Sequence, residues 1–151
     1  MNSPPYKWTT TRALELLKND SISVEAYAQS LLGRIQERDR ATKAWAYLGK
    51  SLKEMEETIV HLNHMAHGEQ DPELVLSQAR LLDNVPIAER GPLHGLAVGI
   101  KDMMATKDTP TEYGSRIYGG HQPSADSHAV SILRAAGALI FGSQHTQITF
   151  P

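Results

Sequence analysis

Two short apolar runs near the carboxyl-terminal end constrain the fold more than any other feature of this sequence. The first extends from Leu96 to Ile100 and the second from Ala138 to Gly142, and each has the length of a buried strand. Between them, residues 124–137 contain the amphipathic stretch VSILRAA and end at Gly137, a pattern typical of a helix closed by glycine. A strand, a helix and a second strand in this order predict a parallel β-α-β unit.

Helical periodicity dominates the amino-terminal half. Segments with apolar residues at helical spacing are 10–19, 23–38, 51–67 and PELVLSQARLLD, which begins at Pro72. Ser23 is the predicted N-cap of the second segment, with Glu25 in its first turn, where a negative charge favours the helix dipole. We therefore expect an α/β chain in which residues 1–90 are mainly helical and residues 91–151 hold a strand, a long loop, a helix and a strand.

Composition excludes several classes of protein. The sequence has no cysteine, which excludes disulfides, thiolate metal sites and a cysteine nucleophile and favours a cytoplasmic location. A net charge of -2 gives no electrostatic signature of a nucleic-acid or anionic-membrane partner. No stretch approaches the roughly 18 apolar residues of a membrane span, and the amino terminus does not look like a signal peptide. We expect neither nucleic acid nor membrane as a partner.

Lys101 directly follows the first predicted strand, at the sheet edge where α/β proteins usually bind ligands. A lysine side chain in water has a pKa of about 10.4, but burial penalises the ammonium, and a neutral lysine can accept a proton. The alternative is a surface lysine that pairs with Asp102 or with solvent. The glycines before it do not make a phosphate-binding P-loop, because Asp102 stands where that motif needs a hydroxyl. The loop at about 101–125 exceeds the usual connection length, which favours a functional role.

Two stretches, GPLHGLAVGIKD at 91–102 and YGSRIYGGHQPSADSHAVSILRAAGALIFG at 113–142, together resemble the amino-terminal part of the amidase signature family. The helical stretch LELLKNDSISVEAYAQSLLGRIQERD at 14–39 is also similar to the opening helices of that family. Its members are Ser-Ser-Lys amide hydrolases. The resemblance implies an amidase signature-type α/β fold that is truncated after the start of its central sheet. Residues 1–151 would then form the amino-terminal part of a single domain.

The resemblance also implies a chemistry. Lys101 falls on the family's terminal base, which takes a proton from one serine so that a second serine can attack the carbonyl of a small-molecule amide and release its C–N bond. No cofactor and no metal are implied. Both family serines lie in a glycine-rich stretch tens of residues beyond the lysine, and none of the serines at 115, 124, 127, 131 and 143 has that context. We expect the 151 residues alone to be inactive. The alternative is a truncated, non-catalytic remnant with no activity or only a binding role.

Three histidines offer another possible site. His61, His64 and His67 are spaced three residues apart, so that on a helix adjacent pairs could share a metal ion but all three converge poorly. A solvated helix face is the simpler interpretation.

Other polar and sulfur-containing residues have structural interpretations beside functional ones. Asp102 could orient its lysine neighbour, but neighbouring strand residues face opposite ways, which favours a structural hydrogen bond in the turn. Met103 and Met104 could line an acyl pocket or fill the core. His94 is expected to be a structural hydrogen-bonding residue, and Asp126 is expected to cap the helix that follows it.

Overall fold

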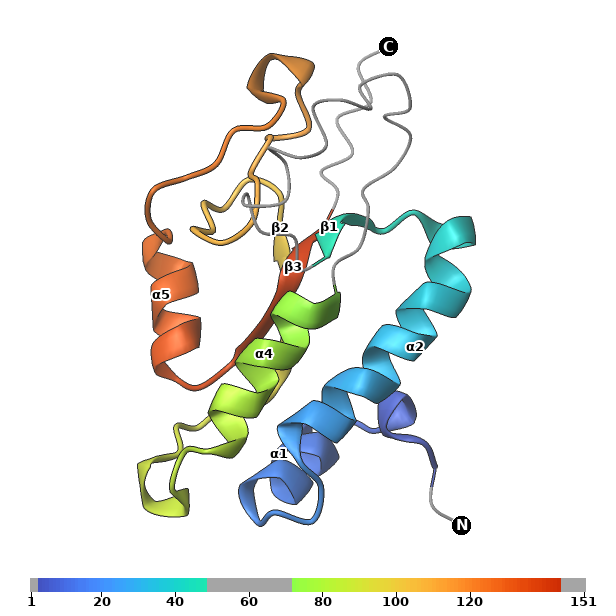
Figure 1. Ribbon diagram of the computed structural model, residues 1–151, viewed down its shortest axis with the longest axis vertical. Coiled ribbons are helices and arrows are strands. Elements are labelled where there is room, and N and C mark those ends of the chain that lie inside the picture. The colour runs from blue at the N-terminus through green and yellow to red at the C-terminus, as the bar shows by residue number, and fades with distance from the viewer. Residues whose placement is uncertain (1–2, 49–71, 145–151) are drawn as a thin grey trace.

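A three-stranded sheet lies at the centre of the computed structural model, which describes residues 3–48 and 72–144 (Figure 1). The strand order is β1-β3-β2. Strand β2 (Ala97–Lys101) runs parallel to β3 (Leu139–Gln144), and helix α5 (His128–Ala135) lies between them in sequence. The predicted parallel β-α-β unit is therefore confirmed. Gly137 ends α5 with a positive φ of 87°, as expected of a glycine that closes a helix.

Strand β1 (Trp45–Leu48) comes from the mainly helical first half and adds a third strand to the two strands that the sequence predicts. It pairs antiparallel with β3, with Tyr47 opposite Ser143 and Leu48 opposite Gly142. Four residues are too few to show a strand period in the sequence. Pairing with a strand about a hundred residues away, rather than local preference, fixes this segment as a strand.

The predicted helices around the sheet are confirmed where the structure describes them. They are α1 (Thr10–Lys18), α2 (Val24–Thr42) and α4 (Pro72–Asp83), and short 3-10 turns occur at Pro5–Lys7, Ile87–Glu89 and Arg116–Tyr118. The side chain of Ser23 accepts a hydrogen bond from the backbone N–H of Ala26 at 3.1 Å, as its role as N-cap requires. The helix expected at 51–67 lies outside the described residues.

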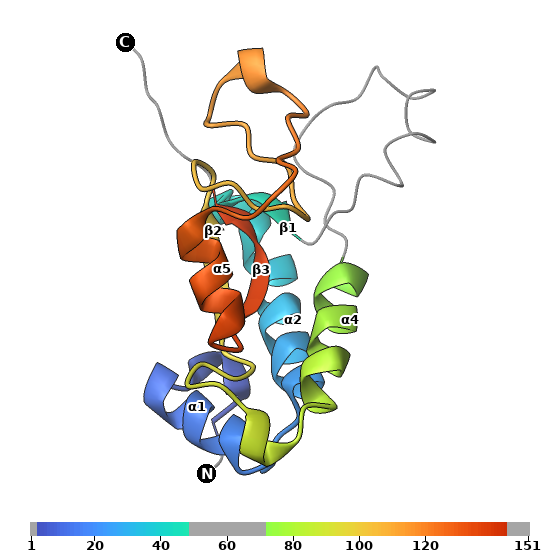
Figure 2. The ribbon, with the colours of Figure 1, turned by 90° about the vertical axis from the view of Figure 1, so that its left-hand side faces the viewer.

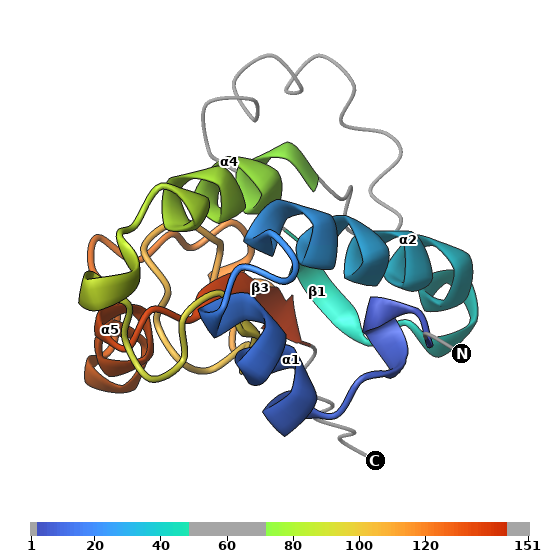
Figure 3. The same ribbon diagram turned by 90° about the horizontal axis from the view of Figure 1, so that it is seen from below.

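Apolar side chains cover both faces of the sheet. On one face, α1, α2 and α4 pack over Leu139 and Phe141, and Figure 3 shows α2 and α4 side by side along β1 and β3. On the other face, Val130 of α5 packs against Ile100 and Ile140. Alternation along β3 sends successive side chains into the two cores. This arrangement leaves the carboxyl ends of β2 and β3 at one end of the molecule, where the long loop begins.

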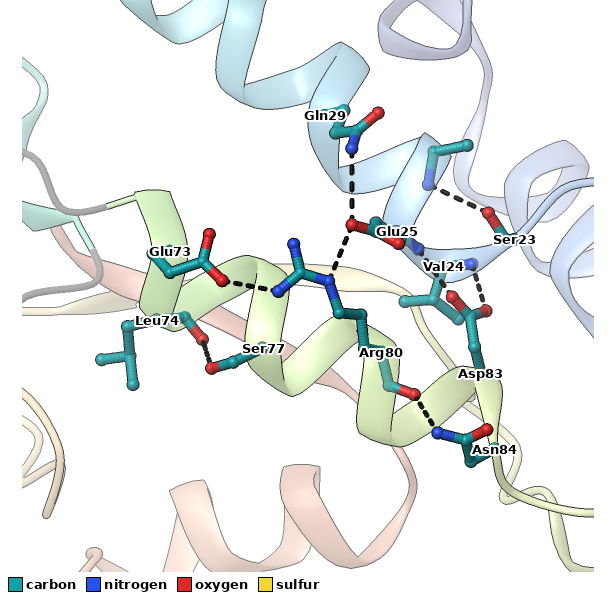
Figure 4. Close-up of polar contacts among 11 residues, drawn as sticks. Ser23, Val24, Glu25, Gln29, Glu73, Leu74, Ser77, Arg80, Asp83 and Asn84 are labelled. Carbon is teal, nitrogen blue, oxygen red and sulfur yellow. Dashed lines mark hydrogen bonds and ion pairs between the residues drawn. The ribbon is translucent and has the colours of Figure 1, made fainter.

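Helices α2 and α4 are joined by polar contacts at the start of α2 (Figure 4). The carboxylate of Asp83 accepts hydrogen bonds from the backbone N–H groups of Val24 at 2.6 Å and of Glu25 at 3.1 Å. Arg80 binds the carboxylates of both Glu25 and Glu73. Asp83 therefore satisfies helix N–H groups that have no partner within their own helix and places a negative charge at the positive end of the α2 dipole.

We expect Asp83→Ala to lower the free energy of unfolding by about 2 kcal/mol, because two charge-assisted hydrogen bonds to part-buried donors are lost. Urea denaturation of the two chains measures the difference. Glu73→Ala is the matched control, since it removes a carboxylate from an exposed ion pair and should cost about 0.5 kcal/mol or less. Equal losses in the two variants would contradict a capping role for Asp83.

Candidate functional site

Lys101 is the last residue of β2 and pairs in register with Gln144, the last residue of β3. The preceding residue, Ile100, is buried in the core beneath α5, so Lys101 belongs to the opposite face of the strand. Gly99 shares the face of Lys101. A Cβ at Gly99 would lie 2.7 Å from Nε2 of Gln144 and 3.0 Å from Cη2 of Trp45, so the missing side chain gives room to both.

Lys101 is exposed in this structure. The described residues therefore do not provide the burial that would favour a neutral amine. Lys101 lies at the carboxyl end of β2, as the sequence predicts, but its side chain is exposed to solvent.

Asp102 lies directly after Lys101 and is buried, with 2% of its surface exposed. Its carboxylate accepts hydrogen bonds from the backbone N–H of Glu112 at 2.8 Å and of Gly114 at 3.1 Å. Its own N–H donates to the carbonyl of Gln144 at 2.9 Å. These contacts agree with the expected structural role in the turn, and they extend that role to the loop ten residues further along.

A second carboxylate, that of Glu112, holds the same loop. It accepts a hydrogen bond from the N–H of Gly120 at 2.7 Å and another from the phenol of Tyr47 on β1. Burial, the hydrogen bond to Glu112 and the negative charges of Glu112 and Asp102 raise the pKa of Tyr47. Tyr47 therefore stays protonated as a hydrogen-bond donor. No sequence pattern indicated this contact, because its two partners are 65 residues apart.

The end of the loop nearest α5 is fixed by an arginine between two carboxylates. Arg134 of α5 contacts both oxygens of Asp108 at 2.6 and 2.7 Å and lies 3.0 Å from Asp126. Asp126 also accepts a hydrogen bond from the N–H of Lys107. Ser127, not Asp126, is the N-cap residue of α5, which corrects the predicted capping role. The two oxygens of Asp126 are engaged by the N–H of Lys107 and by Arg134, and no bond from Asp126 to a backbone N–H of α5 is formed in the described part of the chain.

The loop between β2 and α5 projects beyond the end of the sheet (Figure 2). Three rings pack together on it, with the ring centroids of Tyr113 and Tyr118 5.2 Å apart and His121 6.1 and 6.2 Å from these two rings. Ile117 at the tip is 89% exposed. Carboxylates at the base of the loop and rings near its tip thus order a connection whose sequence indicated only turns.

Comparison with known proteins identifies this arrangement. The family profile described as Amidase matches residues 47–149, which include β2, the long loop, α5 and β3. The chain belongs to the amidase family.

Individual amidase relatives agree with this assignment. A Mycobacterium bovis protein with the provisional name amidase AmiD is 30% identical over 139 residues, which cover 90% of this chain and 24% of that protein. One component of the chloroplastic/mitochondrial glutamyl-tRNA(Gln) amidotransferase of Zea mays is 35% identical over 120 residues, covering 80% of this chain and 21% of that protein. This chain therefore spans about a quarter of the length of the relatives it matches.

Solved structures confirm the amidase-type α/β fold. The native peptide amidase of Stenotrophomonas maltophilia superimposes with a TM-score of 0.72 at 23% identity, over 95% of this chain and 26% of that one. Here too, this chain corresponds to a fragment of the larger fold.

His94 is buried in the turn before β2, with 1% of its surface exposed. Burial, followed by the nearby positive charge of Arg90, lowers the pKa of His94 below its ordinary value of 6.5. Met104 packs against the core beneath α5, whereas Met103 is 52% exposed. The amidase chain therefore holds His94 in its interior and packs Met104 against the core, as the core-filling interpretation of Met104 predicts, while the hydrogen-bonding role of His94 stays a prediction.

We expect the neutral state of His94 to make folding pH-dependent. Below about pH 6.5 the unfolded chain binds a proton at this histidine that the folded chain resists, so stability falls as the pH decreases toward the lowered folded pKa. The test is the urea midpoint at pH 7.5 and at pH 5.5. His94→Asn should lose less stability over this interval than the parent chain. The exposed His128→Asn is the control and should follow the parent.

The histidines at 61, 64 and 67, which the sequence offered as a possible metal site, lie outside the described residues. Within residues 3–48 and 72–144, no three His, Asp or Glu side chains come together in a way that could hold a metal ion. In that same part of the chain, no helix combines the length and apolar character needed to cross a bilayer.

Proposed function

We propose that this chain is the amino-terminal portion of an amide hydrolase and that Lys101 is the base of its Ser-Ser-Lys mechanism. The observation that carries the proposal is the place of Lys101 at the carboxyl end of β2 in a chain of the amidase family. Carboxyl ends of parallel strands are where α/β proteins collect reactive groups. The buried Asp102, the next residue in the chain, binds the backbone of the long loop at the same edge, and this ordered loop supports a functional site there.

In the proposed reaction, neutral Lys101 accepts a proton from one serine, which accepts the proton of a second serine as its oxygen attacks the amide carbonyl. The C–N bond breaks, the amine leaves with a proton, and water then hydrolyses the acyl-serine ester. None of the serines that follow Lys101, at 115, 124, 127, 131 and 143, lies in a glycine-rich stretch of the kind that holds both serines of the family. The proposal therefore needs two serines from outside these 151 residues, and it needs the remainder of the domain to cover the lysine that is exposed here.

The substrate proposed is a small-molecule carboxamide, acted on in the cytoplasm without a cofactor. The lack of cysteine and the net charge of -2 support this setting over a secreted protein or one that binds nucleic acid or a membrane. A second candidate, a non-catalytic remnant of an amidase, is favoured by the exposure of Lys101 in the part of the chain that the structure describes.

A chimera separates the two candidates. The segment of the Mycobacterium bovis relative that aligns with this chain is replaced by residues 1–151 of this chain, since the alignment covers 90% of the chain. The product is assayed with aryl and aliphatic amides and with a serine-directed fluorophosphonate probe. We expect turnover and probe labelling from the chimera, and neither from the 151-residue chain alone. A chimera that unfolds cooperatively but shows no turnover would overturn the proposal and favour the remnant.

A further inference from the structure

Asp102 is the point where three parts of the carboxyl edge meet. Its N–H binds the end of β3 at the carbonyl of Gln144, and its carboxylate binds the loop at the N–H groups of Glu112 and Gly114. The side chain is 2% exposed. A buried carboxylate is costly unless its oxygens find donors, so these contacts strongly favour one position of the loop.

The turn after Lys101 depends on the same residue. The carbonyl of Lys101 accepts hydrogen bonds from the N–H groups of Met103 at 2.7 Å and of Met104 at 3.0 Å, so the chain reverses directly around Asp102. Any movement of Asp102 is passed to the backbone of Lys101, because the two residues share a peptide bond. The lysine side chain lies on the opposite face of the strand and needs no contact with the carboxylate.

Other groups face Asp102 from the neighbouring elements. The phenol of Tyr47 on β1 lies close enough to Asp102 and Glu112 for both carboxylates to disfavour its ionisation, and its hydroxyl is hydrogen-bonded to Glu112. The carboxylate of Glu112 binds Gly120, further along the loop. Asp102 therefore binds the loop at residues 112 and 114, and Glu112 binds the loop again at Gly120.

We propose that Asp102 is a positioning residue that fixes the turn carrying Lys101 by binding the backbone of the loop at 112 and 114. This role rests on the proposed function of Lys101, because the purpose of the fixed turn is to hold that side chain. Asp102 does not touch a substrate and does not exchange a proton with the lysine. It acts through its hydrogen bonds to the backbone of the loop.

Amide hydrogen exchange of the 151-residue chain tests the proposal without any activity. In Asp102→Ala, we expect exchange at the Glu112 and Gly114 amides and at the Met103 and Met104 amides to accelerate at least tenfold, while α2 amides stay unchanged. Asp102→Asn keeps one acceptor oxygen and should give an intermediate effect and a folded chain. Glu89→Gln, at an exposed carboxylate in the turn at 87–89, is the control and should change nothing.

The kinetic constants of an active chimera provide a second test, because loss of a purely structural residue would not lower kcat selectively while leaving KM nearly unchanged. Asp102→Ala should lower kcat at least tenfold with KM changed less than threefold, and Asp102→Asn should recover part of kcat. Unchanged exchange at Met103 and Met104 would overturn the proposal, and so would an unchanged kcat. An inactive parent chimera would count against the proposed function of Lys101, whereas the exchange data would still decide whether Asp102 fixes the turn.

Discussion

Gly142→Ala is expected to destabilise the chain by about 4 kcal/mol or more, the largest loss of stability among the substitutions proposed. A Cβ at this position would lie 2.1 Å from the carbonyl oxygen of Tyr47 and 2.9 Å from Cα of Leu48. Both contacts are to the backbone of β1, which cannot turn aside as a flexible side chain would. The φ of Gly142 is 150°, so strain in the alanine backbone adds to the overlap.

The measurement is urea denaturation followed by circular dichroism. Gly33→Ala is the matched control, because Gly33 lies in α2 with nothing within 4 Å of the position that an added methyl would take, and alanine there should stabilise the helix by up to about 1 kcal/mol. Opposite signs for the two substitutions are therefore expected. A tolerated Gly142→Ala would mean that β1 does not lie against β3 as described.

Local patterns were enough to predict most elements of the fold. Helices α1, α2, α4 and α5 follow apolar periodicity, and β2 and β3 follow short apolar runs with turn residues at their ends. Strand β1 escaped prediction because its four residues become a strand only through pairing with β3. The predictable part of the fold is therefore the part whose signal lies within a few neighbouring residues.

The candidate site also has a part that could be predicted from local sequence and a part that could not. The position of Lys101 at the end of a strand could be predicted, because it depends on the order of elements along the chain. Its exposure could not, because exposure depends on what packs over the sheet edge. Asp126 and Ser127 are both good capping residues in sequence, and only the folded structure shows that Arg134 and a loop N–H engage the aspartate.

The contacts of the long loop are the part of the site that could least be predicted from the sequence. Asp102 binds backbone groups ten and twelve residues away, and the phenol of Tyr47 reaches Glu112 from another strand. Backbone donors leave no mark on the sequence, since every residue except proline has one. A buried carboxylate directly after a strand is a signal in itself, because it must find such donors somewhere.

Lys101→Ala is expected to lower the turnover of an active chimera by at least about 100-fold, the usual scale for loss of a general base. In the 151-residue chain the same substitution should change the free energy of unfolding by no more than about 0.5 kcal/mol, because the side chain is exposed and supports no core contact. A large loss of rate without a loss of stability is what distinguishes a base from a structural residue. Initial rates with an aryl amide and urea midpoints provide the two measurements.

Lys107→Ala is the matched control, since Lys107 is another exposed lysine at the same end of the molecule and has no role in the proposed chemistry. It should leave both rate and stability near those of the parent. A small alkylamine added to the Lys101→Ala chimera should restore part of the lost rate, because it can occupy the space of the missing side chain and accept the serine proton. Near-normal turnover in Lys101→Ala without added amine would show that another group takes the proton and that Lys101 is an ordinary surface lysine at a strand end.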